Sequence, residues 1–112
     1  MIAQINRDQL QLLLRSRDSF KLVDVLAQEH YEREHIPGAI SLPEKSIDTD
    51  AHRHLDKNDM IAVYCAGFSC TASTRAAEKL LAQGYKHVLD YKGGLENYKK
   101  GDLPLAGTTH SD

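Results

Sequence analysis

The chain has 112 residues, of which 41% are hydrophobic and 27% charged, and its formal net charge at pH 7 is −2. Such a composition fits one ordinary globular domain and leaves no room for a second, and the slight negative charge excludes a general attraction for nucleic acid or anionic lipid. No apolar run approaches the ~20 residues of a membrane span and no signal peptide is visible, so the sequence predicts a cytoplasmic protein without nucleic-acid or membrane partners.

Helical and strand-like segments alternate along the chain. Asn6 with Gln9 three residues later forms the signature of a helix start. Asp18 and Ser19 interrupt the apolar pattern, and Pro37 must end the helix that precedes it. Apolar periodicity predicts helices over 6–15, 28–35, 72–83 and 95–100, and strands over 20–26, 39–42, 61–64 and 88–91, with 3–5 as a candidate fifth strand.

This alternation predicts a small α/β domain, in which helices cover both faces of a mainly parallel sheet of four to five strands. We expect the domain to span residues 1–107 and the small polar tail, residues 108–112, to be frayed. Residues 43–59 are polar and are expected to form a loop with one helical turn. Ligands of such sheets bind beyond the carboxyl ends of the strands, and the loop after Tyr64 lies there.

Cys65 is the first candidate for chemistry. It follows the apolar strand that ends at Tyr64, and a short loop then leads into a helix that Gly84 closes. The first turn of a helix has N–H groups without partners and favours an anion, and cysteines at such positions have pKa values lowered from ~8.5 to ~3.5–7.5. The sequence therefore predicts a nucleophilic Cys65 thiolate at neutral pH.

The two cysteines, Cys65 and Cys70, lie five positions apart. They do not form the disulfide framework of a small secreted protein, and they suit a reducing compartment. Their spacing in a flexible loop can nevertheless bring the two Cα atoms within the ~4.4–6.8 Å that a disulfide needs. A reversible disulfide therefore stays open as an alternative to a free nucleophile.

Two other polar residues stand out, and both are predicted to support the structure. Asp24 lies in an apolar strand, where a carboxylate usually caps nearby N–H groups at the strand end. His35 precedes the turn at Pro37 and is expected to hydrogen-bond to local backbone. His52 and His54 have no third ligand nearby and are expected to be exposed, so no metal site is predicted.

Four sequence features occur in an order that is typical of one family: Leu22-Val23-Asp24-Val25, His35-Ile36-Pro37-Gly38-Ala39, Val63-Tyr64-Cys65 before a loop and a helix, and Gly93-Gly94-Leu95. Over nearly its whole length the chain resembles a single-domain rhodanese, a sulfurtransferase. The resemblance implies a rhodanese-like fold, a Cys65 that accepts a sulfane sulfur as a persulfide, and no metal or organic cofactor. It also implies a substrate cradle made of Ala66, Gly67, Phe68, Ser69, Cys70 and Thr71.

The chain departs from the usual pattern of that family at several positions. Leu26 stands where an arginine usually follows the strand aspartate, and Tyr98 stands where an aromatic residue, commonly tryptophan, occurs. The loop is about two residues longer than the common form and resembles a subgroup with a second loop cysteine. Cys70 and Arg75 form a Cys-x4-Arg pattern, so a register in which Cys70 is the nucleophile stays open, although the strand end favours Cys65.

Longer loops of this kind also resemble those of phosphatases and arsenate reductases, which need Cys-x5-Arg to hold a tetrahedral oxyanion. Thr71 occupies that arginine position here, which argues against them. No cation occurs between Ala66 and Thr74, so Arg75 is the nearest residue in sequence for attracting an anionic donor.

Sulfur transfer through Cys65 is the function that the sequence favours. The expected donor is thiosulfate or a persulfide, carried by a small molecule or a protein, and the acceptor is thiophilic. The alternatives are a redox module with a reversible disulfide between Cys65 and Cys70, and a non-catalytic binding module whose cysteines are buried small residues. A zinc site ranks last, because two cysteines without a histidine at ligand spacing do not complete four ligands.

Overall fold

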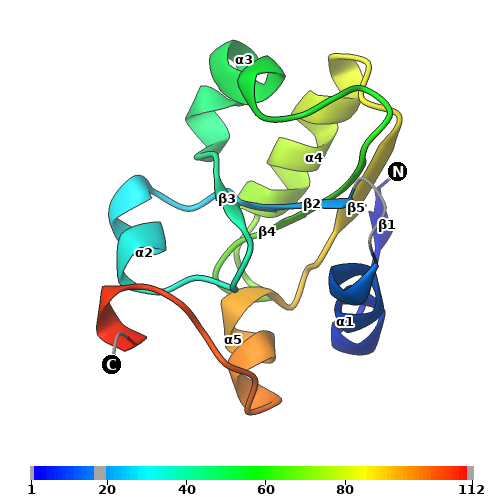
Figure 1. Ribbon diagram of the computed structural model, residues 1–112. Coiled ribbons are helices and arrows are strands. Elements are labelled where there is room, and N and C mark those ends of the chain that lie inside the picture. The colour runs from blue at the N-terminus through cyan, green and yellow to red at the C-terminus, as the bar shows by residue number, and fades with distance from the viewer. Residues whose placement is uncertain (1, 17–19, 111–112) are drawn as a thin grey trace.

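The computed structural model describes residues 2–16 and 20–110. Within them a five-stranded sheet of order β1-β5-β4-β2-β3, parallel at every pairing, runs through the centre of the molecule (Figure 1). The strands are β1 (Ala3–Gln4), β2 (Phe20–Asp24), β3 (Ile40–Ser41), β4 (Met60–Tyr64) and β5 (His87–Asp90). The helices are α1 (Arg7–Arg15), α2 (Gln28–Arg33), α3 (Ile47–Asp50), α4 (Ala72–Ala82) and α5 (Gly94–Lys100), with short 3-10 helices η1 (Glu44–Ser46), η2 (Ala51–Arg53) and η3 (Thr108–His110).

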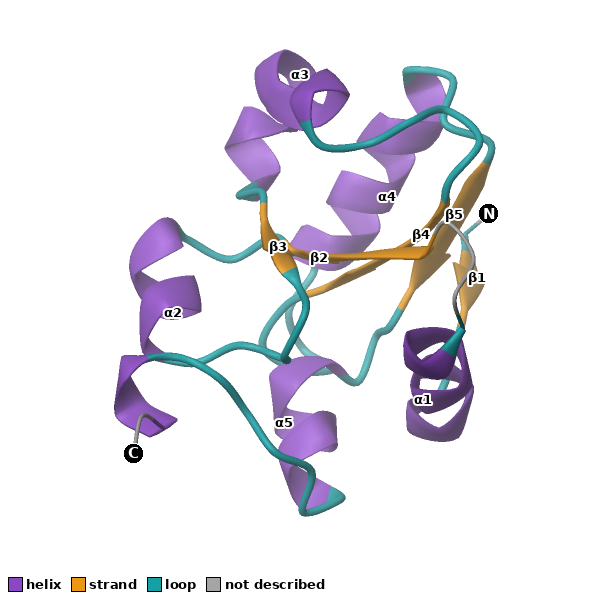
Figure 2. Ribbon diagram, in the orientation of Figure 1, coloured by secondary structure: helices purple, strands orange, loops and turns teal. Residues whose placement is uncertain are grey.

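Helices pack on both faces of the sheet, as the sequence predicts (Figure 2). Side chains of a strand point alternately to its two faces, so β4 contributes Val63 to one core and Ala62 to the other. The first core lies under α3 and α4, and the second lies under α1 and α5. Because both faces of β4 are covered, its apolar run is continuous, which is typical of a central parallel strand. The predicted α/β fold and its candidate fifth strand, β1, are confirmed.

Two predicted elements extend two residues too far at their C-terminal ends, and the other predicted ends differ from the observed ones by at most one residue. β2 ends at Asp24 and not at Leu26, because the Asp24 side chain accepts the N–H of Leu26 at 2.9 Å and turns the chain away from the sheet. α2 ends at Arg33 and not at His35. His35 instead exchanges two backbone hydrogen bonds of 2.9 Å with Ala106, which joins it to the C-terminal segment.

Residues 43–59 contain more helix than the single turn that the sequence analysis assigns to them. η1, α3 and η2 follow one another from Glu44 to Arg53. The buried side chains of Ile47, Ala51 and Leu55 recur every four residues, which is a helical spacing that the many polar neighbours conceal. His52 and His54 are exposed, as predicted.

Part of the C-terminal tail has helical structure. Thr108–His110 form η3, which packs against α2 (Figure 1). The expected break at Asp18 and Ser19, and the end of the tail at 111–112, lie outside the described residues. Within residues 2–16 and 20–110, no helix is long and apolar enough to cross a membrane.

Candidate active site

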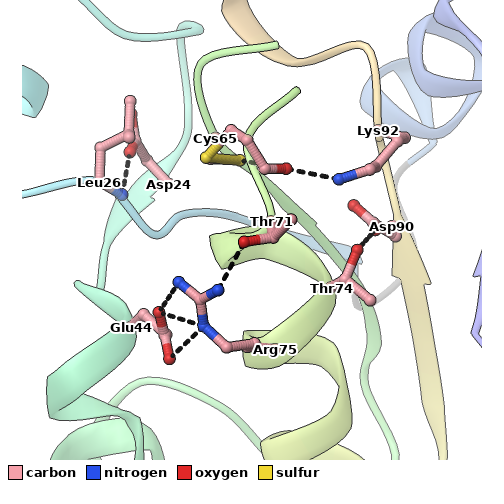
Figure 3. The surroundings of a disulfide bond; sticks show 10 residues. Asp24, Leu26, Glu44, Cys65, Thr71, Thr74, Arg75, Asp90 and Lys92 are labelled. Atoms are coloured by element: carbon pink, nitrogen blue, oxygen red, sulfur yellow. Dashed lines mark hydrogen bonds and ion pairs between the residues drawn. A yellow bond between two sulfur atoms is a disulfide. The ribbon is translucent and has the colours of Figure 1, made fainter. Parts of the chain in front are cut away.

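Cys65 lies at the carboxyl end of β4, in the middle of the sheet, because β5 and β2 flank that strand. Residues 65–71, called the cysteine loop below, connect β4 to α4, which begins at Ala72. Figure 3 shows Cys65 close to the N-terminal end of α4. The predicted unit of strand, loop and helix, with Cys65 at its first corner, is confirmed.

Cys65 and Cys70 form a disulfide across the cysteine loop. Their Cα atoms are 6.4 Å apart, and the N–H of Cys70 donates to the carbonyl of Gly67 at 3.0 Å, which tightens the turn between them. This is the bond that the redox alternative predicts. The structure therefore contains the oxidised form, and a nucleophilic Cys65 thiolate requires reduction of this disulfide first.

The N-terminus of α5 holds the cysteine loop through its backbone. The N–H of Leu95 donates to the carbonyl of Cys65 at 3.0 Å, and the N–H of Glu96 donates to the carbonyl of Ala66 at 2.9 Å. Gly94 makes this approach possible, since its φ is +61° and an added Cβ would lie 2.3 Å from the Cys65 carbonyl oxygen. The Gly93-Gly94 motif therefore fixes the position of the cysteine loop, although the two glycines lie far from Cys65 in sequence.

The residues of the cysteine loop differ in exposure. Gly67 is buried because Glu96 covers it: a Cβ on Gly67 would lie 3.3 Å from the Glu96 Cβ. Phe68 is 65% exposed and is the large apolar side chain of the loop. Their part in substrate binding stays a prediction. The other members of the predicted cradle are exposed or half-buried: Ala66, Ser69, Cys70 and Thr71.

Arg75, predicted to attract an anionic donor, is engaged by a carboxylate. Its guanidinium donates to both oxygens of Glu44 from η1 at 2.9–3.2 Å and also contacts the hydroxyl of Thr71 (Figure 3). These bonds hold the pKa of the Glu44 carboxyl below its ordinary value. Lys79 shares the same carboxylate at 3.1 Å. The charge of Arg75 is thus largely compensated before any ligand binds.

Asp24 and His35 both bond to nearby backbone, and their role as structural support stays a prediction. Asp24 accepts the N–H of Leu26 at 2.9 Å and the hydroxyl of Tyr64 at 2.8 Å, while that hydroxyl accepts the N–H of Ile36 at 3.1 Å. Nδ1 of His35 donates to the carbonyl of Tyr31 at 2.6 Å, which is local backbone. The sequence does not predict the hydrogen bonds of the buried Tyr64 hydroxyl, because a tyrosine within an apolar strand gives no sign of a polar partner.

Asp24→Asn is expected to lower the free energy of unfolding at pH 7 by about 1–3 kcal/mol, because the amide leaves the buried Tyr64 hydroxyl without its acceptor. Sulfur transfer per folded molecule should stay close to that of the wild type. Denaturant unfolding and activity per folded molecule measure the two quantities. Unchanged stability together with transfer lowered by orders of magnitude would contradict the supporting role of Asp24.

The pH dependence of this difference follows from the burial of Asp24. Burial raises the pKa of its carboxyl above the ordinary value of 3.8, so the folded state keeps a proton that the unfolded state has already released. As pH rises from about 3.8 through the raised folded pKa, ionisation of the Asp24 carboxyl lowers its contribution to the stability of the wild type, and Asp24→Asn has no such change. The difference in unfolding free energy between the wild type and Asp24→Asn should therefore decrease over that pH range and stay constant above it.

Lys92 is a residue near the cysteines that the sequence analysis missed. It lies between β5 and α5, and its Nζ donates to the carbonyl of Cys70 (Figure 3). No local motif marks it, since it is 27 positions after Cys65. In the part of the chain that the structure describes, no group of three His, Cys, Asp or Glu side chains is placed to hold a metal ion.

Comparison with known proteins gives the class of this protein. The sequence profile of the rhodanese-like domain matches residues 6–101. The chain is 42% identical over 77 residues to the thiosulfate sulfurtransferase PspE of Escherichia coli, an alignment that covers 67% of this chain and 70% of PspE. It is 32% identical over 99 residues to the thiosulfate sulfurtransferase GlpE of Coxiella burnetii, covering 88% of this chain and 89% of GlpE.

Two solved structures have the same fold. The rhodanese-like domain of the Alr3790 protein from Anabaena sp. matches with a TM-score of 0.86 and 30% identity, over 99% of this chain and 83% of that chain. The crystal structure of the BH2092 protein from Bacillus halodurans matches with a TM-score of 0.88 and 31% identity, over 98% of this chain and 82% of that chain. The chain therefore belongs to the rhodanese-like family. Relatives at 32–42% identity are thiosulfate sulfurtransferases.

Proposed function

We propose that this protein is a sulfurtransferase that carries a sulfane sulfur on Cys65 as a persulfide. The position of Cys65 carries the proposal: it ends the central strand, α5 holds its carbonyl, and its loop leads into the N-terminus of α4. The similarity to two thiosulfate sulfurtransferases supports the same type of reaction.

The proposed reaction is a double displacement. The Cys65 thiolate of the reduced protein attacks the outer sulfur of thiosulfate, the S–S bond of thiosulfate breaks, and sulfite leaves with the bonding electron pair. An acceptor thiolate or cyanide then attacks the outer persulfide sulfur, and Cys65 leaves as a thiolate. A persulfide donor reacts in the same way, with its own thiolate as the leaving group.

The N-terminus of α4 favours each anion of this cycle. The first-turn N–H groups of α4 have no partners within the helix, and hydrogen bonds to charged groups contribute about 1.5–3 kcal/mol each. Cys65 is 1% exposed in the disulfide form. We expect its thiolate to stay largely shielded from water, in surroundings where such interactions are stronger. The protein thereby supplies electrostatic stabilisation from its backbone.

The reduced protein is expected to release one equivalent of sulfite from thiosulfate in the absence of an acceptor. With cyanide as the acceptor, initial rates should give parallel double-reciprocal lines, because donor and acceptor react in separate steps. Sulfite release and thiocyanate formation measure the two half-reactions. Intersecting lines, with no sulfite released before the acceptor is added, would contradict a persulfide intermediate.

A second candidate function is that of a thiol redox module, and the disulfide between Cys65 and Cys70 favours it. An external thiol reduces this bond by exchange, and an external disulfide restores it. The bond can also form from the persulfide: the Cys70 thiolate attacks the inner sulfur of Cys65, and hydrosulfide leaves with the electron pair. Cys70→Ser cannot form the disulfide and therefore separates this activity from sulfur transfer.

A further inference from the structure

Lys92 and Cys65 lie at the same level of two neighbouring parallel strands. The register pairs Val63 of β4 with Asp90 of β5, so the residues two positions later, Cys65 and Lys92, both follow the carboxyl ends of their strands. The contacts agree with this register. Sγ of Cys65 lies 3.5 Å from the carbonyl oxygen of Cys70, and Nζ of Lys92 donates to the same oxygen (Figure 3). The ammonium group of Lys92 and the sulfur of Cys65 thus both contact the carbonyl oxygen of Cys70.

Within residues 2–16 and 20–110, the charge of Lys92 is not compensated by an ion pair. Among the described residues no carboxylate forms a salt bridge with it, whereas Arg75 and Lys79 share Glu44. Two carboxylates near the loop contact other groups: Glu96 covers Gly67 and is exposed, and one oxygen of Asp90 accepts the hydroxyl of Thr74 at 2.9 Å. Half-burial of Lys92 reduces the solvent screening of its charge.

A cleft of about 500 Å³ begins beside Lys92. Phe68 of the cysteine loop lines it together with Lys92, and the opposite wall comes from the start of α1. Its charged lining groups are Arg7, Asp8 and Lys92, which give a net charge of +1. Arg7 donates to the neutral carbonyl of Asn97 at 2.8 Å and so keeps its charge. The cleft therefore suits a small anion and brings it to Lys92 and Phe68. Neither cysteine lines the cleft, and Lys92 links it to them through the carbonyl of Cys70.

We propose that Lys92 is the cation of the sulfur-transfer site, and that it binds a small anionic sulfane-sulfur donor that enters through this cleft. The proposal rests on the proposed sulfur transfer and assigns its donor class. Lys92 would attract the dianionic donor to Cys65 and stabilise the sulfite that leaves with the electron pair. The cysteine loop of this chain contains no cation, and Lys92 would supply the positive charge from outside the loop.

Three variants of the reduced full-length protein test this assignment. Lys92→Met removes the charge and keeps most of the apolar stem, Lys92→Arg keeps the charge, and Lys100→Met removes an exposed charge from the far end of α5. Lys92→Met should raise the KM for thiosulfate at least tenfold and weaken its dependence on salt, with a smaller change in kcat. Lys92→Arg should restore most of the affinity, and Lys100→Met should stay within twofold of the wild type.

Alkylation of Cys65 gives a second measurement that does not depend on sulfur transfer. Anionic iodoacetate and neutral iodoacetamide are compared on the reduced proteins, with Cys65 identified by peptide mapping. Lys92→Met should lower the ratio of the iodoacetate rate to the iodoacetamide rate several-fold, and Lys100→Met should leave it unchanged. If Lys92→Met leaves both the alkylation ratio and the KM for thiosulfate unchanged, while the wild type transfers sulfur, Lys92 does not have the proposed role. Absence of transfer in the wild type, with the ratio still lowered, would instead refute the proposed function and leave the anion site intact.

Discussion

Cys65→Ser is expected to abolish sulfur transfer, by at least about 1,000-fold, because the nucleophile of a covalent mechanism is removed. A serine hydroxyl has a much higher pKa than a thiol and cannot carry a persulfide. The measurement is thiocyanate formation from thiosulfate and cyanide by the fully reduced protein. Circular dichroism checks that the variant is folded.

Cys70→Ser is the matched control, since it makes the same change five positions later in the same loop. It should keep substantial transfer activity. Its difference from the wild type should be seen under mild peroxide: the wild type closes its disulfide and recovers with dithiothreitol, whereas Cys70→Ser becomes over-oxidised and does not recover. Activity kept in Cys65→Ser but lost in Cys70→Ser would reverse the two roles and favour the register from Cys70 to Arg75.

Gly94→Ala is expected to reduce both stability and activity strongly. A positive φ costs a non-glycine residue about 1–2 kcal/mol, and overpacking adds about 1–3 kcal/mol. Here the added Cβ would lie 2.3 Å from the carbonyl oxygen of Cys65, a backbone atom that cannot move without the loop. Denaturant unfolding should show a loss of about 2–5 kcal/mol. Sulfur transfer per folded molecule should also fall, because α5 no longer holds the cysteine loop.

Gly84→Ala separates the backbone strain from the steric conflict. Gly84 also has a positive φ, +95°, but the nearest atom to its added Cβ is Nζ of Lys57 at 3.8 Å. The control should lose only the conformational part of the stability and keep its specific activity. Equal losses of stability in Gly84→Ala and Gly94→Ala, with equal activities, would show that the contact between Gly94 and the loop carbonyl has no special role.

The sequence predicts those parts of the site that depend on neighbours in the chain. These parts involve short separations along the chain. Cys65 follows a strand end, Asp24 bonds to Leu26 two residues onward, and His35 bonds to the backbone of the helix that precedes it. Apolar periodicity and turn residues report such contacts directly. The fold follows from the same signals, because alternating helices and strands leave few arrangements of a parallel sheet.

The parts that the sequence does not predict depend on contacts between distant segments. Lys92 approaches the cysteines only because β4 and β5 pair in parallel with a particular register. Arg75 is compensated by Glu44, which is 31 positions away. Glu44 belongs to a helical segment of which the sequence predicts only a loop with one helical turn. Arg75, the cation nearest to Cys65 in sequence, is thus engaged by Glu44, whereas Lys92, which is distant in sequence, contacts the carbonyl of Cys70.

The location of the sulfane sulfur tests the central claim most directly. The reduced wild-type protein is incubated with thiosulfate, freed of excess donor, and analysed by mass spectrometry as the intact chain and as peptides. Our account predicts an adduct of about 32 Da that is lost on reduction and that maps to Cys65. An adduct found only on Cys70, or no adduct on a protein that still forms thiocyanate, would contradict it.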